Sequence, residues 1–234
     1  MKTWTALILG LCFIIGLGSL GSYFYKARHS ESTIRVVGMA TKSFDSDLVK
    51  WNMTISRSVP TDQIKLGYKQ IADDMTALKA YAVSGGIPEK DISIQPVNSQ
   101  PMYDNYGNQK SFSLSQNVFI ISKDIPLIEK LALTPTFFAE KGIVLQSSNL
   151  DYFNTKLADI KKQLLGEATK DALARAKEIA SAAHAKVGKI SNAKAGIFQI
   201  TEPYSTDVSD YGIYRTNTKK KDIKVTLSAE FTLK

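Results

Sequence analysis

Very few residues of this sequence are of the types that commonly carry out chemistry. The only cysteine is Cys12, and the only histidines are His29 and His184. A disulfide needs two cysteines, and a structural zinc site takes four Cys or His ligands. The sequence therefore excludes a disulfide within it, and it argues against a zinc site and against thiol or Ser-His chemistry.

Two pairs of carboxylates are the next candidates. Asp45 and Asp47 flank Ser46, and Asp73 directly precedes Asp74. Paired carboxylates can transfer protons or bind a cation. Asp is also a common turn residue, and neighbouring acids on a helix usually face solvent. We interpret the first pair as part of a turn and the second as the solvated face of a helix.

The short motifs that position a phosphate or a nucleophile give no functional signal. The sequence contains no P-loop and no G-x-S-x-G, and its glycines at 16, 18 and 21, which match G-x-G-x-x-G, lie in the uncharged N-terminal segment and do not form a phosphate loop. We therefore predict no catalytic residue, no cofactor and no metal, and a protein that is not an enzyme.

Tyrosines and lysines in polar segments are the candidates for an interaction surface. Two of the tyrosines share a predicted turn, and the other residues fall in segment 201–221, which is either a mobile loop or the arm of a long hairpin. The set comprises Tyr103, Tyr106, Tyr204, Tyr211, Tyr214, Lys219, Lys220 and Lys221. Aromatic loops often mediate contacts between subunits, but packing over the edges of a sheet would explain the tyrosines equally well.

The charge balance is basic. The 234 residues include 30 Lys+Arg and 22 Asp+Glu, for a net charge of +8, and 44% are hydrophobic. This is the balance of an ordinary globular protein with one or two domains. The lysine run 219–221 suits an anionic lipid or an envelope polymer, and we expect no nucleic-acid partner.

The N-terminal segment sets the expected compartment. Residues 4–25 carry no charge. A membrane-spanning helix needs about 20 apolar residues, whereas a secretory signal has an apolar region of about 7–15. We predict a signal anchor over 1–30 with a span at 4–25, and a cleaved signal is the alternative. Lys26 and Arg28 follow the run and only Lys2 precedes it, which by itself favours a cytoplasmic body.

Hydrophobic periodicity predicts the elements of residues 31–234. Strands near 34–40 and 49–56 would form a hairpin through the polar turn 42–47. A helix is expected from 60 to 82, and a longer one, rich in alanine, from 156 to 183. Residues 124–138 read as a short helix perturbed by Pro135.

Further strands complete the predicted sheet. They cover 112–120, 143–152, 189–200 and 223–233, and one that begins at Ile92 contains Pro96 and Pro101, which confine it to an edge or break it. The predicted fold class is α+β, with an antiparallel or mixed sheet and two long helices packed on one face.

The order of these elements, with several short motifs, resembles the SIMPL-domain family of bacterial envelope proteins. The matching segments are 35–38 (RVVG), 86–92 (GIPEKDI), 101–103 (PMY), 117–121 (NVFII), the alanine-rich helix around 168–180 and 187–190 (VGKI). The resemblance covers the chain from about residue 33 onward. It implies an exported or membrane-anchored domain, ring-like oligomers in some members, an association with envelope and oxidative stress, and no agreed enzymatic activity.

Together these observations lead to two hypotheses. The first is a non-enzymatic, self-associating protein of the inner membrane, single-pass, with its body in the periplasm and a role in envelope scaffolding or stress protection. The body would be secreted to the periplasm if the signal is cleaved. The second is a periplasmic module that binds a small molecule or peptide in a groove between the helices and the sheet or at the tyrosine loops. A pocket lined by polar groups would favour the second hypothesis.

Overall fold

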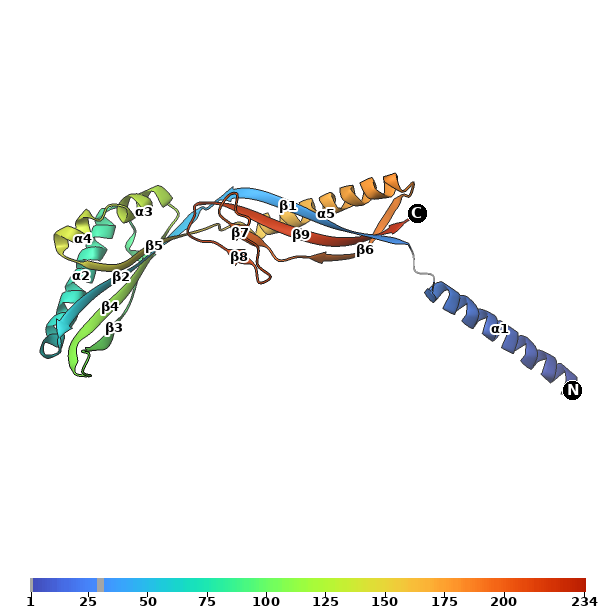
Figure 1. The fold of residues 1–234 in the computed structure, drawn as a ribbon, viewed down its shortest axis with the longest axis horizontal. Helices are drawn as coiled ribbons and strands as arrows, with labels where there is room; N and C mark the ends of the chain where they lie inside the picture. The colour runs from blue at the N-terminus through green and yellow to red at the C-terminus, as the bar shows by residue number, and fades with distance from the viewer. Residues whose placement is uncertain (1, 29–31) are drawn as a thin grey trace. The chain divides into compact units, whose positions relative to one another are not determined.

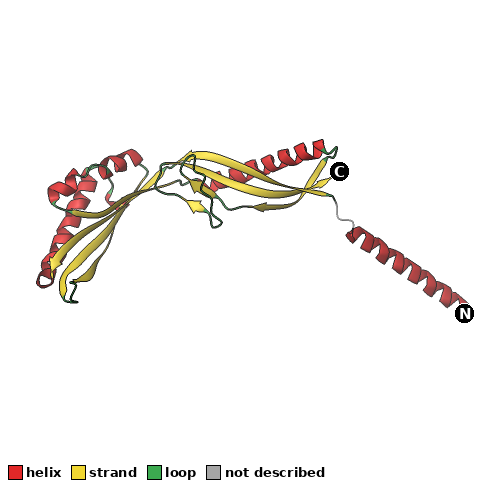
Figure 2. Cartoon of the chain, viewed as in Figure 1, coloured by secondary structure: helices red, strands yellow, loops and turns green. Residues whose placement is uncertain are grey.

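A computed structural model describes residues 2–28 and 32–234 (Figures 1 and 2). The chain divides into two compact units. The first unit comprises Met1–Ala40, Leu165–Gly196 and Thr226–Lys234, and the second comprises Thr41–Leu164 and Ile197–Val225.

The N-terminal segment forms helix α1 (Lys2–Arg28). Its described large apolar side chains are exposed, from Trp4 to Tyr25. Among the residues that the structure describes, no helix is both long and apolar enough to cross a membrane. The helix was expected, but the predicted membrane span at 4–25 is therefore not supported by the structure.

The second unit contains a four-stranded antiparallel sheet. Its strands are β2 (Leu48–Pro60), β3 (Ile92–Tyr103), β4 (Gln109–Ser122) and β5 (Val144–Phe153), in the order β3-β4-β2-β5. The predicted edge position of the proline-containing strand β3 is confirmed. The register of β3 against β4 shifts between Ile94 and Val97, around Pro96, because proline cannot donate to a ladder.

Helices cover one face of this sheet (Figure 1). They are α2 (Ile64–Ser84), α3 (Ile125–Ala132) and α4 (Thr136–Lys141), with short 3₁₀ turns at Thr61–Gln63 and Glu89–Asp91. Alternate residues of β2, including Trp51 and Ile55, are fully buried beneath them. The single helix predicted for 124–138 is wrong. Pro135 begins a second helix, and the Asp124 side chain accepts the Leu127 N–H (3.0 Å) to cap the first.

The other sheet has five strands centred on β9 (Lys220–Leu233). Strand β9 pairs with β1 (Thr33–Asp45), β6 (Val187–Ala195) and β7 (Gln199–Thr201), and β8 (Ile213–Tyr214) pairs in parallel with β7. Every second residue of β9 from Lys221 to Phe231 is buried, so the predicted alternation is confirmed. Strands β1 and β9 and helix α5 (Leu157–Ala182) contribute residues to both units.

In the first unit, α5 packs against β1. A methyl group added at Gly38 of β1 would lie 2.2 Å from the Ala168 carbonyl oxygen and 2.5 Å from the Ala172 nitrogen. The two backbones therefore approach closely, because neither carries a side chain of any size at the contact. Met39 N–H also donates to the Asp171 carboxylate (2.8 Å).

The α+β fold class is confirmed, and three finer predictions are wrong. The strands β1 and β2 do not form a hairpin, because each pairs within a different sheet. The two long helices pack on different sheets, α2 on β2 and β4 and α5 against β1, and not on one common face. The strand predicted for 189–200 is two strands, β6 and β7, separated at Gly196. Periodicity reports that a face is buried, but not what covers it.

Candidate functional site

Polar side chains gather at the C-terminal end of strand β5. The Tyr152 hydroxyl donates to Glu129 Oε1 (2.9 Å) of helix α3, and Lys219 Nζ donates to Glu129 Oε2 (3.3 Å). Burial raises the pKa of Tyr152 to about 12, and its hydrogen bond to Glu129 acts in the same direction. Tyr152 is therefore a neutral hydrogen-bond donor at physiological pH.

Lys221 lies behind this cluster with its side chain fully enclosed. Its ammonium donates to the Thr218 carbonyl oxygen and lies 6.0 Å from the centre of the Tyr152 ring. Burial lowers the pKa of Lys221 to about 8, although the Asp151 carboxylate acts in the opposite direction. A lysine that loses its proton this readily can act as a base or nucleophile. Its exposed fraction is 0%, however, so no substrate reaches the amine in this arrangement.

Strand β5 is tied to the segment that precedes β9. Tyr152 N–H donates to the Thr216 carbonyl oxygen (2.7 Å), and the Thr216 hydroxyl donates to Asp151 Oδ1 (2.7 Å). The second carboxylate oxygen of Asp151 accepts from Asn52 Nδ2 (2.6 Å) on β2.

A cavity of about 550 Å³ opens next to these contacts. It is lined by Asn52, Ala132, Leu133, Ser148, Asn149, Leu150, Asp151, Tyr152 and Asn217. Five of these side chains carry an amide, a serine hydroxyl or a carboxylate. Such groups can bind the polar groups of a ligand. The helix–sheet interface of the same unit, by contrast, is filled by buried apolar side chains.

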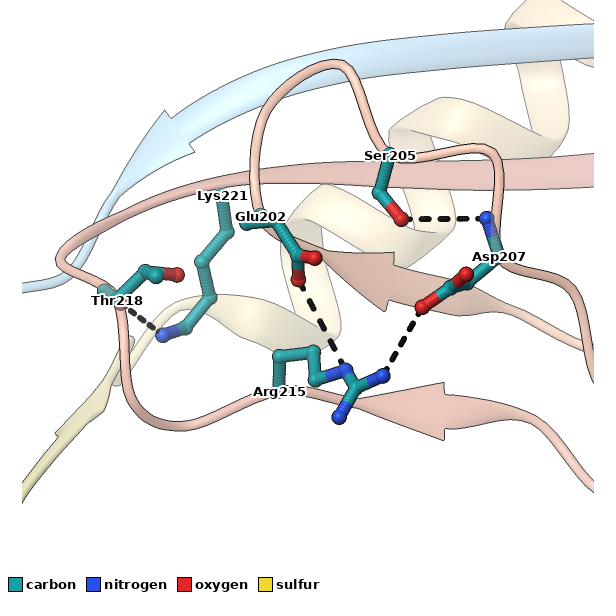
Figure 3. A network of polar contacts seen from close by, with 6 residues as sticks. All are labelled: Glu202, Ser205, Asp207, Arg215, Thr218 and Lys221. Carbon is teal, nitrogen blue, oxygen red and sulfur yellow. Dashed lines mark hydrogen bonds and ion pairs between the residues drawn. The ribbon is translucent and has the colours of Figure 1, made fainter.

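Segment 201–221 is a folded loop that joins β7 to the antiparallel strand β9 (Figure 3). The Arg215 guanidinium forms ion pairs with Asp207 (2.9 Å) and Glu202 (3.8 Å). Arg215 N–H donates to the Ile200 carbonyl oxygen (2.9 Å), and Asp207 N–H donates to the Ser205 hydroxyl (3.2 Å). Arg215 thus connects the two ends of the loop.

The predicted interaction residues have different environments. Tyr106 is 90% exposed, Tyr204 97% and Tyr211 96%, and Tyr103 is also exposed. Tyr214 instead packs edge-on against Phe153, with ring centres 6.3 Å apart, as the packing interpretation expected for a sheet edge.

The lysine run does not form a single exposed patch. Lys219 and Lys220 are exposed, but Lys221 is buried and cannot belong to the predicted interaction surface. The reason is the pleat of β9, which turns Lys221 to the same side as Ile223 and Val225. This signal was present in the sequence, because Lys221 continues the period-two series of buried residues.

The two loops that carry the exposed tyrosines contact the four-stranded sheet at opposite ends. The turn that carries Tyr106 follows the end at which Pro60 pairs with Ser111. Tyr214 contacts Phe153, which pairs with Leu48 at the other end. Strand β2, which joins these two ends, has 13 residues and is therefore about 40 Å long at the usual rise per residue. Tyr106 therefore lies on a different part of this unit from the loop that carries Tyr204 and Tyr211.

Comparison with known protein families identifies the family of this chain. A family model described as SIMPL, a protein of unknown function (DUF541), matches residues 34–231. The chain belongs to the SIMPL family. No curated protein matches this SIMPL-family chain. The predicted resemblance is confirmed, and the family description leaves the function to be inferred from the structure.

One carboxylate of each pair has a structural role in this SIMPL-family chain. The Asp47 carboxylate accepts from Thr155 N–H (2.7 Å) and from the Thr155 hydroxyl (2.6 Å). Burial opposes its ionisation, but these hydrogen bonds outweigh burial and hold the pKa of Asp47 below its usual value. Asp47 thus joins the β1–β2 connection to the start of α5, in agreement with the turn interpretation.

The solvated-face interpretation is wrong for Asp74. The residue is 8% exposed, and its carboxylate forms a two-point ion pair with Arg57, with Nε–Oδ2 and Nη2–Oδ1 distances of 2.5 and 2.8 Å. The hydrogen bond to Asp74 raises the pKa of Arg57, although burial acts against it. Helical periodicity did place Asp74 beside the buried Ile71 and Met75, but the partner on β2 is not visible in the sequence of the helix.

Proposed function

We propose that this SIMPL-family protein works by contact with other molecules and not by catalysis, and that it associates with itself through two tyrosine surfaces. The near-complete exposure of Tyr106 on one loop and of Tyr204 and Tyr211 on another carries the proposal. An aromatic side chain buries about 150–250 Å² of surface in a protein contact. Aromatic residues are therefore among those that contribute most to the binding free energy of an interface.

The separation of the two surfaces determines the kind of assembly. A twofold dimer uses the same surface on both subunits. Two different surfaces at opposite ends of a sheet instead suit a head-to-tail contact, which produces rings where it closes and filaments where it does not. We therefore propose a head-to-tail contact between the Tyr106 loop of one copy and the Tyr204–Tyr211 loop of the next.

The arrangement of the titratable groups supports the proposal that the protein does not act by catalysis. Lys221 and Tyr152 have the most displaced pKa values, and Lys221 is fully enclosed while Tyr152 is engaged with Glu129. Catalytic groups with perturbed pKa values usually face a cleft where a substrate can reach them.

We also propose that α1 holds the protein at the inner membrane with its body in the periplasm. The uncharged sequence of 4–25 and the exposed apolar side chains of α1 support this location. We propose a role in envelope scaffolding or stress protection, which is compatible with that location. The exposed Lys219 and Lys220 are available for an anionic lipid or an envelope polymer.

Two measurements test the location. Mass spectrometry of the mature N-terminus distinguishes an anchor from a cleaved signal, since cleavage removes the segment. Protease added to spheroplasts should degrade the body. A body that is protected until the cells are lysed would contradict the periplasmic location.

Light scattering after size exclusion tests self-association. The buried apolar residues of the described chain lie between Val36 and Phe231, so a chain that lacks residues 1–30 retains its core. We expect a mass that rises with concentration. Tyr106→Ser in one variant and Tyr204→Ser with Tyr211→Ser in another should each give monomers.

Mixing the two variants provides the decisive comparison. Each retains the surface that the other has lost, so an equimolar mixture should form dimers and nothing larger. Tyr68→Ser on α2, where the tyrosine is 45% exposed, is the matched control and should assemble like the unaltered chain. A monomer at all concentrations in the unaltered chain would contradict the proposal.

A further inference from the structure

The two edges of the four-stranded sheet differ in their ability to pair with another strand. Strand β3 contains Pro96 and Pro101, which have no N–H, and its register is already irregular. Prolines of this kind protect an edge from pairing. Strand β5 has no proline among its ten residues, and in the described part of the chain it pairs only with β2.

The backbone groups on the outer edge of β5 can be identified from one hydrogen bond. Tyr152 N–H donates to Thr216, a residue outside this sheet, and therefore points away from β2. Backbone groups of successive residues in a strand point to alternate sides. The N–H and C=O groups of Leu150 and Ser148 consequently point outward as well, with no strand of the described chain beside them.

These two residues face the cavity of about 550 Å³. Leu133, at the end of α3, is 75% exposed on one side of it, and Asn217 lies on another. An open strand edge that is flanked by pockets for side chains is the arrangement by which an extended peptide adds to a sheet as a further strand.

We infer that the outer edge of β5 binds an extended peptide segment that carries a lysine or arginine. The peptide exchanges backbone hydrogen bonds with Ser148 and Leu150, places an apolar side chain against Leu133, and directs its cation to Asp151. This site is separate from the tyrosine surfaces and does not depend on self-association.

The charges around the cavity select the basic side chain. Asp151 is the only Asp, Glu, Lys or Arg in the lining of this cavity. Lys50 lies opposite Asp151 in the strand register, but its Nζ sits 4.4 Å above the Phe119 ring. Lys221 attracts the same carboxylate from the interior, where it is enclosed. Each Asp151 oxygen accepts one hydrogen bond, from Thr216 or from Asn52, and keeps a second lone pair, to which a cation of the peptide can donate from outside.

The first experiment uses the full chain in detergent micelles and a synthetic peptide as the probe. The peptide has six residues of alternating threonine and valine, with one central lysine and a fluorescent label. Fluorescence anisotropy reports binding. A second peptide, with N-methyl groups on the backbone nitrogens of one edge, keeps every side chain but loses those donors. A third has N-methyl groups on the other edge.

We expect one of the two methylated peptides to bind about tenfold or more weakly than the unmodified one, because two backbone hydrogen bonds are lost. The other methylated peptide should bind like the unmodified probe. Replacing lysine by glutamate should also weaken binding. Equal affinities for all four peptides, or no binding of the unmodified probe, would overturn the proposal.

Variants of the protein locate the site. Ser148→Pro removes an outward N–H, and Ser148→Ala is its matched control, because both lose the hydrogen bond that Trp51 Nε1 donates to the Ser148 hydroxyl (2.9 Å). Binding should be lost in the first and retained in the second. Asp151→Asn should abolish the preference for lysine over glutamate, whereas Asp73→Asn on the exposed face of α2 should retain it.

The comparison of the peptides uses the unaltered protein, so it tests the proposal even if a variant fails to fold. Should Ser148→Pro abolish self-association measured by light scattering while the unaltered chain ignores the peptide, the occupant of the edge is a second copy, and the inference of a separate peptide partner is overturned. Tyr106→Ser should leave peptide binding unchanged, which separates this site from the proposed self-association.

Discussion

The two long helices of this SIMPL-family chain reach their sheets in opposite ways. Helix α2 places large side chains, among them Ile71, Met75 and Leu78, against the four-stranded sheet of the second unit. In the first unit, α5 presents alanines at every fourth position, and all four are almost completely buried: Ala168, Ala172, Ala176 and Ala180.

This difference separates two sources of stability. The α2 interface depends on the volume of its side chains, because apolar area is removed from water by filling the space between helix and sheet. The α5 interface depends on the lack of side chains, because Gly38 and the alanines allow backbone atoms to approach directly. Removing atoms should therefore damage the first interface, and adding atoms should damage the second.

The largest effect is expected from Leu78→Ala in α2. Leu78 is 1% exposed, and truncation leaves a cavity that its neighbours fill only partly. We expect the free energy of unfolding of the second unit to fall by about 3 kcal/mol, measured by urea denaturation. A loss below about 1 kcal/mol would show that this interface does not depend on volume.

The opposite change, Gly38→Ala, should destabilise the first unit by about 2 kcal/mol or more, because the new methyl group meets backbone atoms of α5 that cannot rotate away. Hydrogen exchange of the α5 amides measures the effect within this unit. Gly166→Ala is the control. Nothing lies within 4 Å of a methyl group at Gly166, so this helix substitution should stabilise slightly.

The polar contacts of the two helices should also differ in how much they contribute to stability. Asp74→Asn in α2 breaks a two-point ion pair beneath the helix and should lower the free energy of unfolding by about 1–2 kcal/mol. Asp171→Asn in α5 replaces the charged acceptor of Met39 N–H by a neutral amide oxygen at a partly exposed position and should cost less. Equal losses in thermal denaturation would show that burial does not distinguish the two contacts.

The smallest effect concerns Lys221, the one buried lysine among the described residues. Its pKa in the folded protein is about 8, below the ordinary value of 10.5, so the unfolded chain binds more protons between these pH values. Stability should therefore rise with pH in this window. Relative to Lys221→Met, the unaltered chain should gain about 1.5 kcal/mol between pH 8 and 9.5.

The upper limit of pH 9.5 avoids a second titration. The pKa of Tyr152 in the folded protein is about 12, so above pH 10 the unfolded chain loses this proton first and stability falls. A difference between the two proteins that does not change from pH 8 to 9.5 would contradict the lowered pKa of Lys221. Comparing Lys220→Met, at an exposed position of the same strand, controls for the lost charge.

The sequence predicted most elements and little of the candidate site. Helices α2 and α5, the strand β9 and the edge position of β3 followed from local spacing and from proline chemistry. The β5 site was missed because its residues come from four separate stretches, represented by Asn52, Leu133, Asp151 and Asn217. Only the burial of the neighbouring Lys221 had a signal, in the period-two pattern of its own strand.

By itself, the sequence determined the family, the α+β class and which face of most elements is buried, because these depend on the order and period of apolar residues. Tertiary structure alone decided that β1 and β2 belong to different sheets, that Asp74 has a partner and that β5 has an open edge. Strand pairing and burial of a charge are settled between residues far apart in the chain, where many registers satisfy the same local pattern and only packing selects among them.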